Sequence, residues 1–261
     1  MRPRRSALPL MLVALGVVLS ACGSTSPSGS SGSLATSATV TVFAASSLKE
    51  SFTDIGAAFE TANPGVRVTF NFGPSSGLAT QITQGAPADV FASASQKTMD
   101  TVSAASLAAS TQVFAVNRLA IATPVQQSVP VSSLADLAKP DVKVAVCQPE
   151  VPCGVAALTL FEKNQVSVTP VSEEADVKAV LTKVQLGEVD AGVVYLTDVK
   201  AASGGVTGVL IPAGQNVTTR YPIAALLTSS GSASATSTAF VDYVLSPAGQ
   251  QVLLNAGFAS P

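Results

Sequence analysis

The sequence contains no histidine among its 261 residues. A Ser/His/Asp triad, a Cys/His catalytic pair and a His-ligated metal centre are therefore excluded. Charged residues are also scarce, at 11%, and the 14 Lys and Arg residues are outnumbered by 16 Asp and Glu residues. Because binding to a phosphate backbone needs a basic surface, we expect no nucleic-acid partner.

Tryptophan is absent as well, and aromatic residues reach only 5%, although 47% of the chain is hydrophobic. Much of the apolar content is Ala and Val. This composition is typical of buried parallel strands and of helices that pack through small residues.

The first 21 residues have the pattern of a secretory signal. Three arginines precede an apolar run over 7–19 that is too short to span a bilayer comfortably. The run ends in LSAC at 19–22, which resembles a bacterial lipobox. By that resemblance the signal is removed before Cys22, whose sulfur carries a lipid that anchors the protein to the outer face of the membrane. Loss of the three arginines moves the formal charge from −2 to −5. A chance cysteine and a retained transmembrane helix are the alternatives.

A flexible tether is expected over 22–37, because residues 23–37 are almost entirely Gly, Ser, Thr and Pro. From residue 38 onward, short apolar strands alternate with amphipathic helices. The first series predicts strands at 40–44, 66–72 and 89–92 and helices at 48–62 and 78–84. This βαβαβ order indicates a parallel sheet covered by helices.

A second alternating series lies between two long apolar runs, 112–122 and 221–228. It predicts strands at 142–147 and 190–195 and helices from about 154 and over 177–186, and two final helices follow at 236–245 and 247–255. We therefore expect an α/β fold with two Rossmann-like lobes joined by a hinge that the chain crosses twice. The predicted lobes are 38–117 with 222–261, and 118–221.

Ligands of open α/β sheets bind beyond the carboxyl ends of strands, where helices begin. At the first such loop, Ser47 to Glu50 has capping-box spacing, so its hydroxyl is expected either to cap the helix or to bind an anion. In the second loop, Ser75 lies among two glycines and a proline, which is typical of a plain turn or of close approach to a small ligand. The loop matches neither a Walker nor a dinucleotide-binding motif.

Three later loops offer further groups. Cys147 and Cys153 are expected to form a disulfide in an oxidising compartment, with two buried free thiols as the alternative. Glu173 and Glu174 are expected to face solvent ahead of a helix. Asp176 is a plausible cap that leaves the Val177 N–H free to donate. Tyr195, at a strand end, fits either a core position or a ligand-binding hydroxyl.

The five loops contain almost no basic residues. Lys49 and Lys178 lie on the helices behind them. Hydroxyl and backbone N–H donors without a cation suit a fully ionised oxyanion better than a carboxylate, which commonly pairs with Arg.

Several motifs, in order, resemble the substrate-binding proteins of molybdate ABC transporters, which are type II periplasmic binding proteins. The matching segments are VFAASSLKESF (42–52), FGPSSGLATQI (72–82), GAPADVFASA (85–94), VPCG (151–154), ADVKAVL (175–181), GVVY (192–195), RYPIA (220–224) and LSPAGQQVLLNAGF (245–258).

The resemblance implies an oxyanion, molybdate or tungstate, bound in a cleft between two lobes. The implied ligands are the hydroxyls and N–H groups of Ser47 and Ser75, the backbone N–H groups of Cys153 and Val177, and the Tyr195 hydroxyl. Cys153 stands where the family commonly has a small residue. Molybdenum would be held only as its oxyanion, with no direct bond from the protein to the metal.

The resemblance also implies a monomeric, non-enzymatic protein without a cofactor, which delivers its ligand to the permease and ATPase of an ABC importer. Three alternatives stay open. The first is a receptor for sulfate, phosphate or a small organic anion on the same fold. The others are an exported serine hydrolase with a lysine base, and an adhesive lipoprotein without a small ligand.

Overall fold

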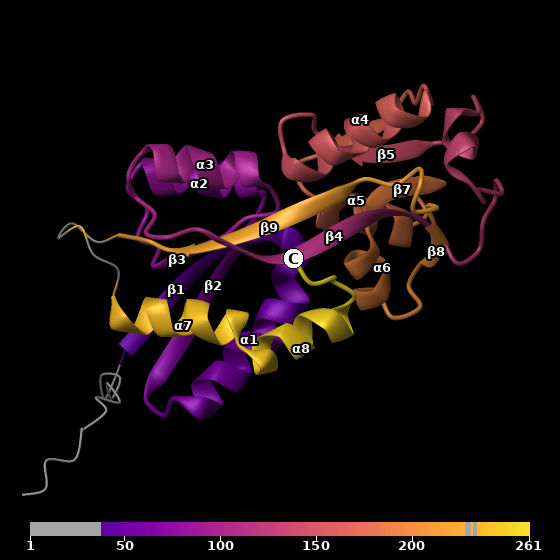
Figure 1. Ribbon diagram of the computed structural model, residues 1–261. Coiled ribbons are helices and arrows are strands. Elements are labelled where there is room, and N and C mark those ends of the chain that lie inside the picture. The colour runs from indigo at the N-terminus through magenta and orange to yellow at the C-terminus, as the bar shows by residue number, and fades with distance from the viewer. Residues whose placement is uncertain (1–37, 228–230, 232–233) are drawn as a thin grey trace, which may run out of the picture. The chain divides into compact units, whose positions relative to one another are not determined.

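Two long strands, β4 (Gln112–Thr123) and β9 (Thr218–Ala225), pair along the middle of the sheet (Figure 1). The computed structural model describes residues 38–227, 231 and 234–261. The predicted signal, the predicted tether and Cys22, the predicted lipidation site, lie outside the described residues. Among the residues described, no helix is long and apolar enough to cross a membrane.

The remaining strands have eight residues or fewer. They are β1 (Ala38–Ala45), β2 (Val66–Gly73), β3 (Val90–Ala92), β5 (Val144–Cys147), β6 (Ser172–Glu174), β7 (Ala191–Tyr195) and β8 (Thr207–Leu210). The helices are α1 (Lys49–Ala62), α2 (Ser75–Thr83), α3 (Gln96–Ala104), α4 (Pro152–Asn164), α5 (Val177–Gln185), α6 (Leu196–Ala201), α7 (Ala235–Leu245) and α8 (Pro247–Ala256). Two short 3-10 helices are η1 (Ser46–Leu48) and η2 (Leu134–Ala138).

The strands follow the order β2-β1-β3-β9-β4-β7-β5-β6, and β8 pairs with β4 outside this path. β1 runs parallel to β2 and β3, and β5 runs parallel to β6 and β7. Residues 112–118 of β4 pair with β9, whereas residues 119–123 pair with β7 and β8. β4 therefore carries the chain from one half of the sheet into the other, and β9 returns it. The residue boundaries of the two predicted lobes stay a prediction.

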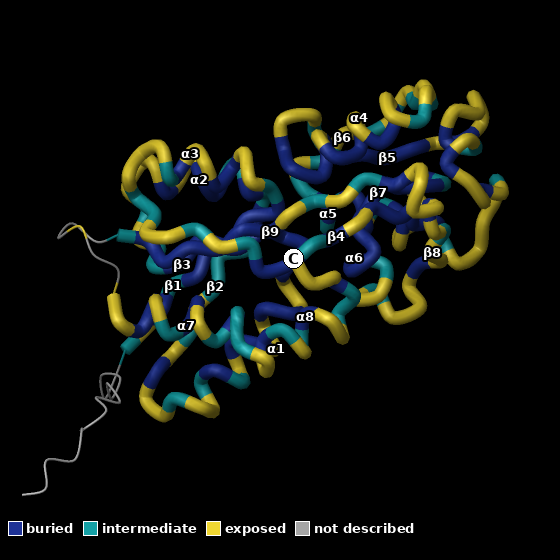
Figure 2. Tube along the Cα trace, in the orientation of Figure 1, coloured by how far each residue is buried: buried dark blue, intermediate teal, exposed yellow. Residues whose placement is uncertain are grey.

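Separate hydrophobic cores lie on the two sides of this crossing. One draws its buried residues from 119–211, and another from 40–115 together with 221–258. In the second, Phe52, Phe59 and Phe240 pack edge to face, with ring centroids 5.3–6.3 Å apart. Figure 2 shows buried strands inside and helices whose outer faces are exposed. Burial of one face of each helix, at the spacing read from the sequence, explains why the predicted α/β elements form.

Some elements differ from the predictions. α2 begins at Ser75 rather than at 78, because Pro74 takes the N-cap position and the serines form the first turn. Glu173 and Glu174 lie ahead of α5 as predicted, but in the short strand β6, which was not among the predicted elements. Glu173 is exposed, whereas Glu174 is half-buried and accepts a hydrogen bond from Ser172. α3, α6 and β8 have no counterpart among the predicted elements.

The loop before α4 is closed by the predicted disulfide between Cys147 and Cys153, whose Cα atoms lie 5.7 Å apart. Gly154 follows directly and packs against the same loop. A Cβ at Gly154 would collide with the carbonyl oxygen of Gln148 and would lie 2.8 Å from the carbonyl oxygen of Cys147. The start of α4 therefore sits against backbone that cannot move aside easily.

We expect Gly154→Ala to lower the free energy of unfolding by about 3 kcal/mol, because the added methyl group overlaps main-chain atoms rather than a flexible side chain. Gly77→Ala is the matched control. Its Cβ meets only the Pro74 ring, at 3.4 Å, within a helix that gains from alanine. Urea unfolding followed by circular dichroism measures both variants, and equal stabilities would contradict the expectation.

Candidate functional site

All five residues predicted to bind an oxyanion line one small cavity: Ser47, Ser75, Cys153, Val177 and Tyr195. Each lies where a strand ends or a helix begins, on η1, α2, α4, α5 and β7. The cavity volume is about 20 Å³. Pockets for organic ligands are far larger, at roughly 300–1,000 Å³, so the cavity excludes ligands of that size.

Two serines present hydroxyls to the cavity from one side. Ser75 Oγ accepts the Ala94 N–H at 3.0 Å. Ser47 Oγ lies 2.9 Å from the Tyr221 hydroxyl. The capping interpretation of Ser47 is wrong, because α1 begins through the 3-10 turn η1 and its N-cap, Leu48, makes no side-chain hydrogen bond.

Two helix N-termini face the cavity from the other side. Cys153 lies in the first turn of α4, which has proline at its start, and Val177 is the first residue of α5. Asp176 is the N-cap of α5, and its Oδ1 accepts the N–H groups of Lys178 and Ala179. First-turn N–H groups lack acceptors within the helix, and the helix dipole adds partial positive charge there.

Tyr195 completes the lining. Its side chain is buried, and its hydroxyl has no hydrogen-bond partner among the residues that the structure describes. Burial raises the pKa of this hydroxyl above its ordinary value, so the group keeps its proton. It is therefore both a core residue and an unused donor at the cavity wall.

No lysine or arginine lines the cavity within the described part of the chain, and Asp176 is the one charged residue there. Its carboxylate is already occupied, since Asp176 Oδ2 accepts the Ser46 hydroxyl at 2.9 Å while Oδ1 caps α5. The arrangement therefore offers neutral donors and no counter-cation.

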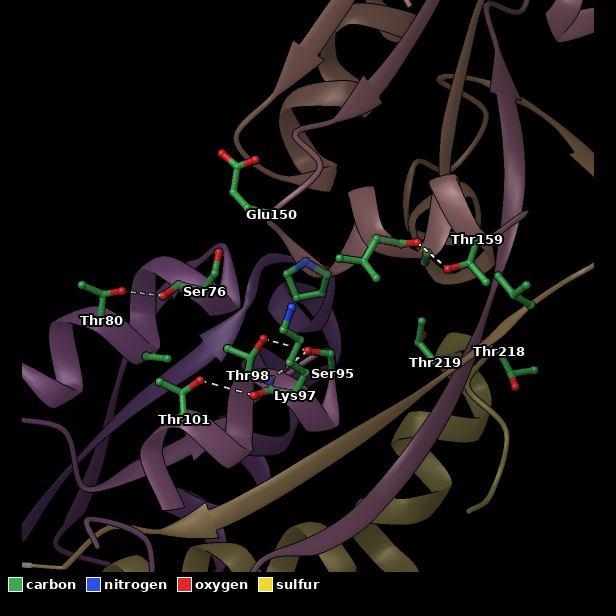
Figure 3. A pocket seen from close by; sticks show the side chains of 15 residues that line it. Ser76, Thr80, Ser95, Lys97, Thr98, Thr101, Glu150, Thr159, Thr218 and Thr219 are labelled. Carbon is green, nitrogen blue, oxygen red and sulfur yellow. Dashed lines mark hydrogen bonds between the residues drawn. The ribbon is translucent and has the colours of Figure 1, made fainter. Parts of the chain in front are cut away.

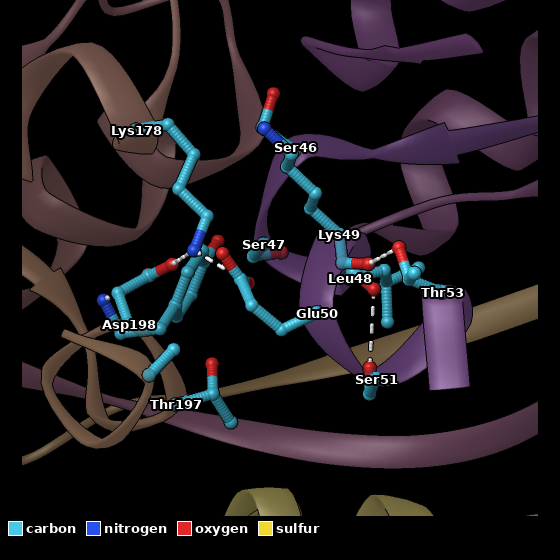
Figure 4. Close-up of polar contacts among 12 residues, drawn as sticks. Ser46, Ser47, Leu48, Lys49, Glu50, Ser51, Thr53, Lys178, Thr197 and Asp198 are labelled. Carbon is cyan, nitrogen blue, oxygen red and sulfur yellow. Dashed lines mark hydrogen bonds and ion pairs between the residues drawn. The ribbon is translucent and has the colours of Figure 1, made fainter. Parts of the chain in front are cut away.

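Lys178 lies just behind this wall, between two carboxylates (Figure 4). Its Nζ is 2.7 Å from Glu50 Oε2 and 3.0 Å from Asp198 Oδ1. Burial disfavours the ammonium, but Asp198 and Glu50 outweigh that effect and raise the Lys178 pKa. Burial also raises the pKa of the fully buried Asp198 to about 6, against the opposing effect of Lys178.

Asp198 is not among the site residues predicted from the sequence. Asp198 Oδ2 accepts the Tyr195 N–H at 3.0 Å, so it ties the end of β7 to Lys178. The signal for it was the spacing of Tyr195 and Asp198, which resembles a capping box at the start of α6.

A larger groove of about 360 Å³ shares Pro152 with the cavity (Figure 3). Side chains from α2, α3, α4 and β9 line it, and most of the polar ones are Ser and Thr. Lys97 and Glu150 are the charged residues of its lining. The groove brings solvent close to the outer side of the α4 N-terminus.

We expect Lys178→Met to lower the free energy of unfolding by about 3–5 kcal/mol, because the buried Asp198 carboxylate loses its counter-charge. Lys183→Met is the control on the same helix, since its ammonium pairs only with partly exposed carboxylates and little change is expected. Urea unfolding of both variants measures the difference. A Lys178→Met protein as stable as the control would show that Asp198 needs no cation.

Comparison with known proteins gives a consistent result. The model of the bacterial extracellular solute-binding protein family matches residues 40–259. A molybdate-binding protein ModA from Mycobacterium tuberculosis H37Rv is 45% identical over 96% of this chain and 95% of its own. The putative ABC transporter substrate-binding lipoprotein YvgL from Bacillus subtilis is 34% identical over 61% of this chain and 64% of its own.

The fold agrees with that result. The structure of the Azotobacter vinelandii periplasmic molybdate-binding protein superposes with a TM-score of 0.75, at 19% identity, over 85% of this chain and 99% of that one. This likeness confirms the predicted α/β periplasmic-binding-protein fold. The chain therefore belongs to the bacterial extracellular solute-binding protein family, in the group of the ModA proteins, and is a binding protein rather than an enzyme.

Proposed function

We propose that the protein captures molybdate in the cavity between the ends of β1, β7 and the helices α2, α4 and α5, and delivers it to an ABC importer. One observation carries the proposal. Five chain segments far apart in sequence converge on a cavity of about 20 Å³ whose lining offers hydroxyl and N–H donors. The relatives named as molybdate-binding proteins support the same ligand.

The chemistry of the lining favours an ion that carries no proton. Molybdate and tungstate are fully deprotonated dianions at neutral pH, so every oxygen accepts hydrogen bonds from the donors around it. Hydrogen phosphate would turn its own O–H toward donors, and a buried donor without an acceptor is costly. Sulfate has the same charge and no proton, so its exclusion depends on the size of the cavity.

The ligand roles follow from this chemistry. Ser47, Ser75 and Tyr195 would donate through their hydroxyls, and Cys153 and Val177 through their backbone N–H groups. Helix N-termini are suited to such anions, because their free N–H groups and the helix dipole act together.

The site of action is the outer side of the membrane, in keeping with an extracellular family. A lipid on Cys22 would hold the protein there, and the relative named as a lipoprotein supports this anchor. The permease and ATPase of the importer would then receive the ion.

Isothermal titration calorimetry of the purified protein tests the ligand. We expect tight binding of molybdate and tungstate, and weak or absent binding of sulfate, phosphate and citrate. A protein that binds sulfate as tightly as molybdate would be a general dianion receptor. If neither molybdate nor tungstate gave binding heat, the proposal would be overturned.

Ser75→Ala tests one donor. We expect molybdate affinity to fall at least about tenfold, because a hydrogen bond to a charged group is lost. Stability should fall by about 1–3 kcal/mol, because the Ala94 N–H loses its buried acceptor. Ser76→Ala is the control, since Ser76 lines the outer groove and not the cavity. Calorimetry and urea unfolding separate the two effects, and unchanged affinity would remove Ser75 from the site.

A further inference from the structure

A serine hydroxyl has a single proton, and this limits a site made only of donors. If a serine is to donate to the bound anion, its proton cannot be used elsewhere. A hydrogen-bond donor on the side of the serine oxygen away from the cavity has this effect. The serine oxygen accepts from that donor, and its own proton is left to point toward the ligand. Our inference rests on the proposed function and concerns how this direction is set.

Ser75 has such a donor in the main chain. The Ala94 N–H can only donate, and it lies 3.0 Å from Ser75 Oγ. The Ser75 proton is therefore left for the cavity. Ser46, which also lines the cavity, is in the opposite situation: its proton goes to Asp176 Oδ2 at 2.9 Å, so its hydroxyl is not a donor to the ligand.

Ser47 has no main-chain donor of this kind. Its oxygen lies 2.9 Å from the Tyr221 hydroxyl, and either atom of that pair is able to donate. Which of the two hydroxyls donates depends on a third residue, Asn117, which contacts the Tyr221 hydroxyl. Asn117 Nδ2 lies 3.4 Å from the Tyr221 hydroxyl and 2.9 Å from Thr197 Oγ1. An amide nitrogen only donates, so the Tyr221 oxygen accepts from Asn117. A hydroxyl that accepts a hydrogen bond becomes a better donor, and this favours Tyr221 as the donor and Ser47 Oγ as the acceptor.

Two observations fix this chain of donors. The Asn117 oxygen accepts the Arg118 N–H at 2.9 Å, which determines which end of the amide faces Tyr221. The Tyr221 ring is fully buried and meets Phe114, Tyr195 and Phe258 edge to face, with centroids 5.4–6.3 Å apart. Burial raises the Tyr221 pKa, so the hydroxyl stays protonated.

We propose that Asn117 and Tyr221 are positioning residues that direct the Ser47 proton into the cavity, through hydrogen bonds running from Asn117 to Tyr221 to Ser47. Asn117 contacts Tyr221, and Tyr221 contacts Ser47, while neither Asn117 nor Tyr221 lines the cavity. The Tyr221 ring also packs on Tyr195, so the effect that passes through Ser47 has to be separated by a variant that lacks the Ser47 hydroxyl. Of two adjacent serines, Ser47 becomes a donor and Ser46 does not.

Tyr221→Phe tests this in the full chain, since it removes the hydroxyl and keeps the ring and its aromatic contacts. We expect molybdate affinity measured by calorimetry to fall about tenfold, because the Ser47 proton is no longer held toward the ligand. Tyr243→Phe is the matched control. Tyr243 lies in α7, packs on Phe59 and does not line the cavity. The Tyr243→Phe protein should therefore bind molybdate as the wild type does. Thermal unfolding of each variant verifies folding.

A double-mutant cycle with Ser47→Ala separates positioning from general weakening. In the Ser47→Ala background, Tyr221→Phe should change molybdate affinity by less than about twofold. Equal losses in both backgrounds, or wild-type affinity in Tyr221→Phe alone, would overturn the inference while leaving molybdate binding established. A wild-type protein that binds neither molybdate nor tungstate would overturn the proposed function, and the inference with it.

Discussion

The antiparallel pairing of β4 with β9 is the interaction on which the rest of the structure depends. Residues 112–118 of β4 pair with β9, and the last five residues of β4 leave that ladder for β7 and β8. The same register places Asn117 opposite Thr219 and Ala115 opposite Tyr221. One ladder of hydrogen bonds thus joins the two halves of the sheet and sets the distance between the side chains behind Ser47. A shift of register would disturb both at once.

The negative charge of the protein is arranged so that it does not oppose an anion at the cavity. Asp176, which lines the cavity, and Asp198, which binds the main chain of Tyr195 in the cavity wall, both accept hydrogen bonds from the main chain. Asp198 also pairs with Lys178, and Asp176 accepts the Ser46 hydroxyl. Their lone pairs are therefore used inside the protein. The helix dipoles and hydroxyls supply the local positive field, which the net charge of the chain does not describe.

The sequence was informative wherever function depends on local order. Strand ends followed by helix starts, combined with the family resemblance, predicted the five residues that line the cavity, although their role as ligands stays a prediction. The disulfide and the Asp176 cap followed from local spacing and are present. Short polar elements such as α3 were missed because they contain few apolar residues, although Met99 and Val102 of α3 lie on one buried face.

Long-range partners were beyond the sequence. Ser47 meets Tyr221 across 174 residues, and Asn117 meets Thr197 across 80. Such contacts depend on register and on how helices pack, which a local pattern does not contain. The capping prediction for Ser47 failed because the helix is preceded by the 3-10 turn η1, so that Leu48 and not Ser47 stands at the N-cap of α1.

Main-chain donors, as proposed for residues 153 and 177, would leave the site free to change its side chains during evolution. An N–H group is present whatever side chain a residue carries, proline excepted, so the identities of residues 153 and 177 are free to respond to other demands. At residue 153 the side chain forms the disulfide that closes the loop before α4. At residue 177 a buried valine joins the hydrophobic core. In the proposed site, recognition and folding would thus be selected on different atoms of the same residues, and mutation could alter one without erasing the other.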